Sequence, residues 1–202
     1  MVSRAERILQ LKVTLKEIKP AVWRRIQVPG DYTFWDLHVA IQDAMGWLDC
    51  HLHQFEVFNP RKRRMEYVGI PDEEGLFDEE TLPGWEVPVG RLLHSSNPRA
   101  IYLYDFGDSW AHTVVLEKTL VPETQVRYPR SMGGRRKCPP EDCGGTPGYS
   151  HFLEAITDPN HEEHAEMLEW AGGKYDPDDF DPRAVAFEDP RERLRLMLED
   201  RS

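Results

Sequence analysis

The sequence lacks any long hydrophobic run. Nothing in its 202 residues approaches the roughly 20 consecutive apolar residues that a membrane-spanning helix needs. Its start, residues 1–7, leads into a segment interrupted by charges and has no apolar signal-peptide core. Cysteine is scarce: Cys50, Cys138 and Cys143 are an odd number of thiols, which argues against a disulfide framework. These absences predict a protein without membrane contact that remains in the cytoplasm with reduced thiols.

Signatures of common enzyme classes are also missing. The chain contains no Walker phosphate loop, no Gly-x-Gly-x-x-Gly, no nucleophile elbow, no His-Glu-x-x-His and no helix-turn-helix. Their absence favours a non-enzymatic binding or accessory protein over an enzyme.

None of three long segments of the chain has an excess of positive charge. Residues 1–60 hold seven Lys/Arg and seven Asp/Glu, residues 61–137 hold twelve of each, and residues 138–202 hold six against seventeen. The net charge of −11 therefore arises in the C-terminal third. An acidic surface repels phosphate backbones, so nucleic acid is disfavoured as a partner but not excluded. The basic runs 61–64 and 135–137 either form local patches or are solvated loops.

What is present is enough apolar material for a folded core. The chain is 40% hydrophobic, and we expect a single domain over residues 1–202. Within it we expect a sheet-rich part at 8–120, an ordered Pro/Gly-rich loop at 121–149 and a helical part at 150–202.

Alternation of apolar and polar residues, the period of a half-buried strand, recurs through the first 120 residues. Pro20 separates two such runs and Gly107-Asp108 separates another two, so each pair is predicted to form a hairpin. The expected strands are residues 11–19, 21–28, 51–58, 65–70, 101–106 and 110–118.

One helix is expected among these strands, at residues 34–45. Its apolar side chains share one face, Thr33 and Asp36 have the spacing of a capping box, and Gly46 ends the run.

The pattern becomes helical and acidic after residue 149. Helices are expected at 150–157 and 160–171, with shorter pieces opened by the Asp-Pro pairs at 181–182 and 189–190. Strands first and helices afterwards are typical of an α+β fold. We therefore expect an N-terminal mixed or antiparallel sheet with one packed helix, followed by an acidic all-helical C-terminal part.

Three groups of residues are candidates for a divalent metal site. Asp105, Asp108 and His112 lie on or beside the second hairpin, where they either converge or serve the turn and nearby ion pairs. His51 and His53 are two apart on an expected strand, so their rings would share a face, either as metal ligands or as residues bordering the core.

The third group is the loop Cys138–Cys143. Its prolines and the glycines after it give a shaped backbone, and it contains Glu141 and Asp142. A Cys-x4-Cys spacing alone does not complete a zinc site, so Cys138 would need histidines from elsewhere, such as His151 or those near residue 51.

Five stretches, taken in order, resemble a known family. Together they resemble the plasmid ORF-three-like family first described from a root-inducing plasmid, over roughly residues 8–190. The stretches are Pro20–Arg25 with Val28-Pro29, Ala44–Trp47, His51–Phe55, Tyr104–Trp110, and Cys138–Asp142 with Gly144-Gly145.

This resemblance implies an association with mobile genetic elements, because the family is similar to resolvase-named passenger proteins of insertion elements. The sequence contains no serine or tyrosine recombinase arrangement. The resemblance nominates as motif positions Trp23, Arg24, His53, Asp105, Asp108, Trp110, Cys138, Glu141 and Asp142.

Two functions follow as hypotheses. The first is a non-enzymatic binding or accessory module with no cofactor, whose acidic C-terminal helices meet a basic protein partner. The alternative is a metal-assisted hydrolase or nuclease. Its metal ligands would come from His51, His53, Asp105, Asp108, His112 and Glu141.

Overall fold

A single sheet of eight strands organises the molecule. A computed structural model describes residues 6–71 and 80–200 of the chain. Across the sheet the order is β5-β4-β3-β6-β7-β1-β2-β8, and neighbours are antiparallel except β4 and β5. The strands are β1 (Ile8–Leu15), β2 (Trp23–Pro29), β3 (His53–Asn59), β4 (Arg64–Gly69), β5 (Thr81–Pro83), β6 (Arg99–Tyr104), β7 (Trp110–Leu120) and β8 (Arg130–Arg135).

The two expected hairpins are confirmed, because β1 pairs with β2 and β6 pairs with β7, and β3 pairs with β4 in a third. The sheet also depends on a pairing that no local pattern shows, because β1 lies between β2 and the distant β7. That pairing joins the two expected hairpins into one sheet.

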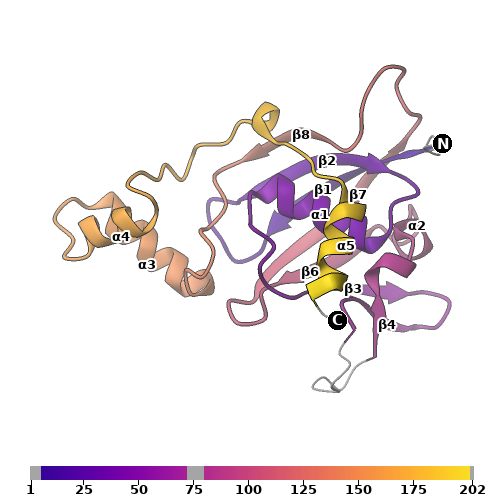
Figure 1. Cartoon of the computed structure of the whole chain (residues 1–202), viewed down its shortest axis with the longest axis horizontal. Helices are drawn as coiled ribbons and strands as arrows, with labels where there is room; N and C mark the ends of the chain where they lie inside the picture. Colours follow the sequence, from indigo (N-terminus) through magenta and orange to yellow (C-terminus); the bar gives the residue numbers. More distant parts are fainter. Residues whose placement is uncertain (1–5, 72–79, 201–202) are drawn as a thin grey trace.

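The helix predicted at residues 34–45 is confirmed as α1 (Phe34–Met45). Thr33 and Asp36 form the expected capping box, in which each side chain accepts the other's backbone N–H, and Gly46 takes the left-handed conformation at the C-terminal cap. Ten of its twelve residues are buried, more than one apolar face accounts for. The additional burial arises because the C-terminal helix α5 (Pro190–Asp200) lies over α1 (Figure 1).

The expected fold class is wrong in its C-terminal part, which is not all-helical. Beyond α3 (Gly145–Thr157) the described residues, up to 200, form only α4 (His164–Trp170), a short 3-10 turn η2 (Pro182–Ala184) and α5. Gly172-Gly173, both with positive φ, follow the end of α4, and residues 171–181 and 185–189 between these pieces are not helical. In addition, β8 lies within the segment expected as a loop, so the protein is mostly sheet with short helices.

The α3–α4 pair projects from the side of the sheet (Figure 1). From this lobe the chain returns along β8, where the Phe180 ring lies against Gly134, and then continues to α5. The C-terminal segment is thus a strap that passes over one edge of the sheet and ends on α1. Two further short elements, η1 (Gly84–Glu86) and α2 (Val89–Leu92), connect β5 to β6.

Gly148 permits a close contact between α3 and the loop that precedes it. A Cβ atom on Gly148 would lie 1.9 Å from the Cys143 carbonyl oxygen, which belongs to the backbone and cannot move freely. Alanine normally stabilises a helix interior relative to glycine by about 1 kcal/mol. Here we expect Gly148→Ala to destabilise the protein by about 2 kcal/mol, because the loop and helix must separate. Urea denaturation measures this change.

Gly90→Ala is the matched control. Gly90 also lies in a helix, α2, but its added Cβ would meet only the Gly30 carbonyl oxygen at 3.9 Å, an ordinary contact. We expect this variant to be neutral or slightly stabilising. Equal effects of the two substitutions would contradict the role given to Gly148.

Candidate functional site

Three loops from distant parts of the chain meet at one edge of the sheet. β3 begins at His53, which pairs with Tyr104 at the end of β6, and Tyr104 pairs with Trp110 at the start of β7. The segment before β3 and the turn between β6 and β7 must therefore lie together. We call the meeting point the three-loop site, formed by residues 46–52, 105–109 and 138–144.

Specific hydrogen bonds hold the third loop in place. The Trp47 Nε1–H donates to the Pro139 carbonyl (3.0 Å), and the Gly144 N–H donates to Asp108 Oδ2 (3.0 Å). Gly145 is packed so closely that an added Cβ would lie 2.6 Å from the Asp108 carbonyl oxygen. The loop is thus fixed against both of the others.

His51, Asp105 and Asp142 bring one ring nitrogen and two carboxylates together at this site. His51 Nε2 lies 3.0 Å from Asp142 Oδ1 and 3.7 Å from Asp105 Oδ2, yet it forms no hydrogen bond. One ligand atom from each residue falls within 4.8 Å of the others. Such separations suit ligands that share one ion at bond lengths of about 2.0–2.2 Å.

Asp105 is oriented by its own turn. Its Oδ1 accepts hydrogen bonds from the N–H groups of Gly107 (2.9 Å) and Asp108 (3.3 Å), which leaves Oδ2 facing His51. The side chain is only 9% exposed, whereas that of Asp142 is 70% exposed. The group is therefore anchored on one side and open to solvent on the other.

The backbone at this site is unusual. Asp49, Asp105 and Asp142 all have positive φ, between 55° and 58°. Few residues other than glycine adopt this region, and such conformations concentrate at functional sites because the surrounding structure must hold them.

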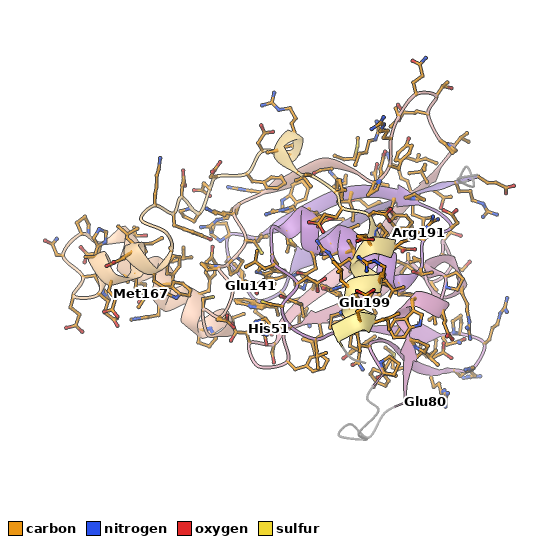
Figure 2. All side chains as sticks on the ribbon, viewed as in Figure 1. His51, Glu80, Glu141, Met167, Arg191 and Glu199 are labelled. Carbon is orange, nitrogen blue, oxygen red and sulfur yellow. The ribbon has the colours of Figure 1, made fainter. Side chains whose placement is uncertain are left out.

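A second group of potential ligands overlaps the first through His51. Cys50 and Glu141 also place ligand atoms within 4.8 Å of one on His51. Glu141 Oε1 accepts from the Leu48 N–H (2.7 Å) and the Tyr104 hydroxyl (3.0 Å). Burial, and then the nearby Glu141 charge, raise the pKa of Tyr104, so this hydroxyl keeps its proton. In Figure 2, His51 and Glu141 lie between the sheet and the α3–α4 lobe.

Other residues nominated from the sequence lie elsewhere. Asp108 accepts the Gly144 N–H, and His112 is fully buried on β7 with Nδ1 3.2 Å from the Tyr102 carbonyl. Cys138 is 6% exposed, and burial raises the pKa of its thiol well above the ordinary value. None of these three joins the His51 group.

Trp110 is fully buried and forms, with Trp47 and Tyr104, an aromatic layer beneath the loops. Trp23 lies half-buried on β2 with the cations of Lys12 and Arg25 over its ring at 5.0 and 5.3 Å. Neither tryptophan contributes a ligand, so their roles are in packing.

His51 and His53 do not share a face. The strand begins only at His53, which points into the core and is 2% exposed, whereas His51 lies in the irregular segment before it. His53 instead meets His38 and Asp49, which the sequence reasoning missed. A histidine at position 38, one turn before Gln42 on the predicted helix and among apolar neighbours, was the available signal.

No helix within residues 6–71 and 80–200 combines the length and apolar character that crossing a membrane requires.

Comparison with known proteins places the chain among relatives of similar length. It is 38% identical over 181 residues to the uncharacterized protein y4hQ of Sinorhizobium fredii, covering 89% of this chain and 87% of the relative. A crystal structure of a protein of unknown function from Methanosarcina mazei superimposes with a TM-score of 0.85 at 40% identity. The match covers 91% of this chain and all of that one.

The sequence profile of the plasmid pRiA4b ORF-3-like proteins matches residues 7–184, nearly the span over which the motifs indicated a resemblance. All three loops of the three-loop site lie inside the match. The chain belongs to the plasmid pRiA4b ORF-3-like family.

Proposed function

We propose that the protein is a metal-assisted hydrolase that holds a divalent ion at the three-loop site through His51, Asp105 and Asp142. The observation that carries this proposal is the convergence of two carboxylates on one ring nitrogen, which lies within ion-pair distance of both but forms no hydrogen bond. Three protein ligands with one side open to solvent are typical of catalytic metal sites, because substrate or water needs a coordination position.

The ligand chemistry favours a first-row transition ion. One imidazole with two carboxylates suits Zn²⁺, Mn²⁺ or Fe²⁺ better than Ca²⁺, which prefers oxygen alone. When bound, such an ion lowers the pKa of a coordinated water and so supplies a nucleophile near neutral pH. The two turn N–H groups that bind Asp105 Oδ1 would fix the carboxylate that holds it.

Glu141 is the proposed proton acceptor. It lies within 4.8 Å of His51, and the Leu48 N–H and the Tyr104 hydroxyl hold its carboxylate in position. A carboxylate beside a metal-bound water can take the proton released as water attacks. The protonated Tyr104 hydroxyl donates this hydrogen bond and so orients the Glu141 carboxylate.

A small ester is a better substrate for this site than a nucleic acid polymer. The net charge of −11 repels an extended phosphate backbone. Leu48 and Leu52, 79% and 46% exposed, flank the site and offer apolar contact to a compact substrate.

Metal binding and turnover test the proposal together. We expect Asp105→Asn to lower the affinity for Zn²⁺ or Mn²⁺ by about 100-fold, since changes in the residues that merely support metal ligands already cost about 10–100-fold. Equilibrium dialysis with elemental analysis measures affinity, and chromogenic phosphate and carboxylate esters measure turnover.

Asp108→Asn is the matched control for Asp105→Asn. The side chain is three residues away in the same turn, lies outside the ligand group, and as asparagine can still accept the Gly144 N–H. We expect it to retain metal and activity. A wild-type protein that takes up no divalent ion, or equal losses in the two variants, would refute the metal site.

A second candidate is the non-enzymatic accessory module, with a basic protein as partner. The α3–α4 lobe favours it, because residues 145–171 contain six carboxylates and no lysine or arginine, and the lobe projects from the sheet (Figure 1). Bound metal without turnover of any ester would favour this candidate. With either function we place the protein in the cytoplasm, where its three free cysteines would remain reduced, and in association with mobile elements.

A further inference from the structure

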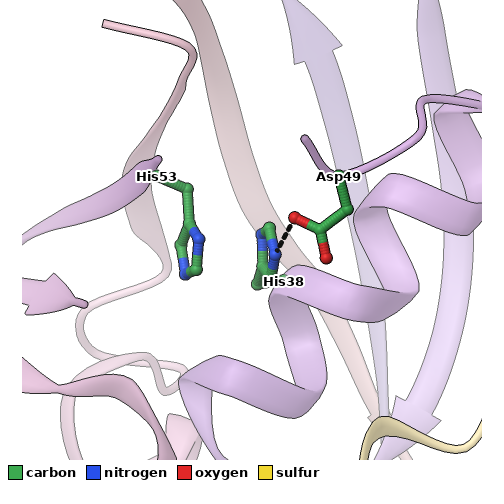
Figure 3. Close-up of side chains that lie close together, drawn as sticks. All are labelled: His38, Asp49 and His53. Carbon is green, nitrogen blue, oxygen red and sulfur yellow. Dashed lines mark hydrogen bonds and ion pairs between the residues drawn. The ribbon is translucent and has the colours of Figure 1, made fainter. Parts of the chain in front are cut away.

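A further group of potential metal ligands lies inside the molecule, away from the solvent-exposed side of the three-loop site. It consists of His38 on α1, His53 at the start of β3 and Asp49 in the loop between them (Figure 3). His38 is fully buried and His53 is 2% exposed. The two imidazole rings lie face to face, with centroids 3.4 Å apart and planes 7° from parallel.

His53 has no hydrogen-bond partner at either ring nitrogen. Buried polar side chains nearly always have a partner, and one that does not requires a physical explanation. A neutral imidazole has one ring nitrogen with a free lone pair, and on His53 no hydrogen bond occupies it, so it is available to a metal ion.

We propose that His38, His53 and Asp49 form a second, buried site for a divalent transition ion of the Zn²⁺ class. His38 Nε2 lies 2.7 Å from Asp49 Oδ1, and one ligand atom from each of the three residues falls within 4.8 Å of the others. Two imidazoles and a carboxylate are a common protein ligand set for zinc.

Binding requires the His53 ring to turn. A ring nitrogen binds an ion in the plane of its ring, and stacked rings cannot both do so at one point. Rotation of His53 breaks no hydrogen bond, because its ring has none. His38 stays in place. With the ion on Nε2, the His38 ring would carry its proton on Nδ1 and donate a hydrogen bond to the Tyr102 hydroxyl oxygen, 2.8 Å away.

Such an ion would join parts of the structure that are separate in the sequence. It would tie α1 to β3 and to the loop that carries His51. Arg193 of α5 forms ion pairs with Asp49 Oδ2 at 3.3 Å and with Asp43 of α1 at 3.0 Å. The inferred role is to stabilise the core beneath the three-loop site, and it does not depend on the proposed hydrolase activity.

The test uses the full chain carrying Asp105→Asn and Asp142→Asn, which removes two ligands of the three-loop site. We expect this double variant still to bind one equivalent of Zn²⁺ by elemental analysis. Free zinc at about 100 times its dissociation constant should raise the melting temperature by roughly 5–10 °C. A double variant that binds no zinc overturns the proposal.

Adding His53→Gln to this double variant should abolish the zinc and the shift in melting temperature. His112→Gln is the matched control, because His112 is equally buried and has an unpartnered Nε2, but it belongs to none of the ligand groups. Zinc that persists after His53→Gln, or that is lost equally after His112→Gln, also overturns the proposal. If His53→Gln fails to fold by circular dichroism, His38→Gln provides the same comparison.

Discussion

Replacing Arg24 with alanine is expected to lower the free energy of unfolding by about 4 kcal/mol. The side chain is 1% exposed, and its guanidinium donates to the carbonyl oxygens of Ala44 (2.7 Å), Trp23 (3.0 Å) and Arg135 (3.2 Å). It also lies 3.7 Å from the centre of the Phe180 ring in the C-terminal strap. Alanine would leave buried carbonyls without donors and a void beneath the strap.

Two substitutions separate this effect from a simple change of charge. Arg24→Lys keeps the charge but loses the planar guanidinium with its several N–H donors. We therefore expect it to lower the free energy of unfolding nearly as much as Arg24→Ala. Arg25→Ala removes the neighbouring arginine, whose side chain is 33% exposed and paired with Glu117, and should cost less than about 1 kcal/mol. Urea denaturation of the three variants measures these values. If Arg24→Ala costs no more than Arg25→Ala, the structural role of Arg24 is refuted.

Acid is expected to destabilise the protein through His112, by about 3 kcal/mol between pH 6.5 and 4. Burial lowers the pKa of His112 to about 4, whereas in the unfolded chain it is near 6.5. Below pH 6.5 the unfolded state therefore binds a proton that the folded state does not, and stability falls as the pH falls. Above pH 7 this residue contributes no pH dependence, and below pH 4 the loss stops growing.

His112→Gln isolates this contribution, because glutamine does not titrate while carboxylates elsewhere titrate in both proteins. We expect the variant to be less sensitive to acid than the wild type, with the difference in unfolding free energy changing by about 1.4 kcal/mol per pH unit from 6 to 4.5. Denaturation curves at several pH values measure it. Parallel pH profiles would mean that His112 ionises in the folded protein much as it does in the unfolded one.

Arg24 and His112 show what family motifs and local patterns leave undecided. Both were nominated as potential site residues, yet each lies in the core. A residue type and its spacing are the same whether the side chain binds a ligand or satisfies buried carbonyls. Only the burial of the side chain and its hydrogen-bond partners in the tertiary structure distinguish a ligand-binding role from a structural one.

Local features were predictable where the interactions that determine them join residues close together in the sequence. The capping box of α1 and the β6–β7 hairpin depend on residues within a few positions of one another, and both are confirmed. The C-terminal part was not predictable in the same way. Four separate helical pieces were expected there and were grouped as an all-helical part, but the chain between α4 and α5 is largely non-helical and contacts β8.

The candidate site was only partly predictable. His51, Asp105 and Asp142 were each nominated, but in separate groups. Their meeting depends on the register that places His53 opposite Tyr104 and on the hydrogen bonds that dock the third loop. His38 was not nominated, because its place among apolar residues of the helix, the one local signal, does not show that it meets His53 and Asp49.

By itself the sequence determined the family, the helix α1, the hairpins and the supply of histidine and carboxylate side chains, since these follow from residue type and from contacts between near neighbours. The tertiary structure decided which of those side chains meet. Because β3 begins at His53, His51 lies in the preceding loop beside Asp105, whereas His53 points into the core and contacts His38. Such contacts join residues tens of positions apart, and the pairing of whole strands, which no local pattern encodes, sets their geometry.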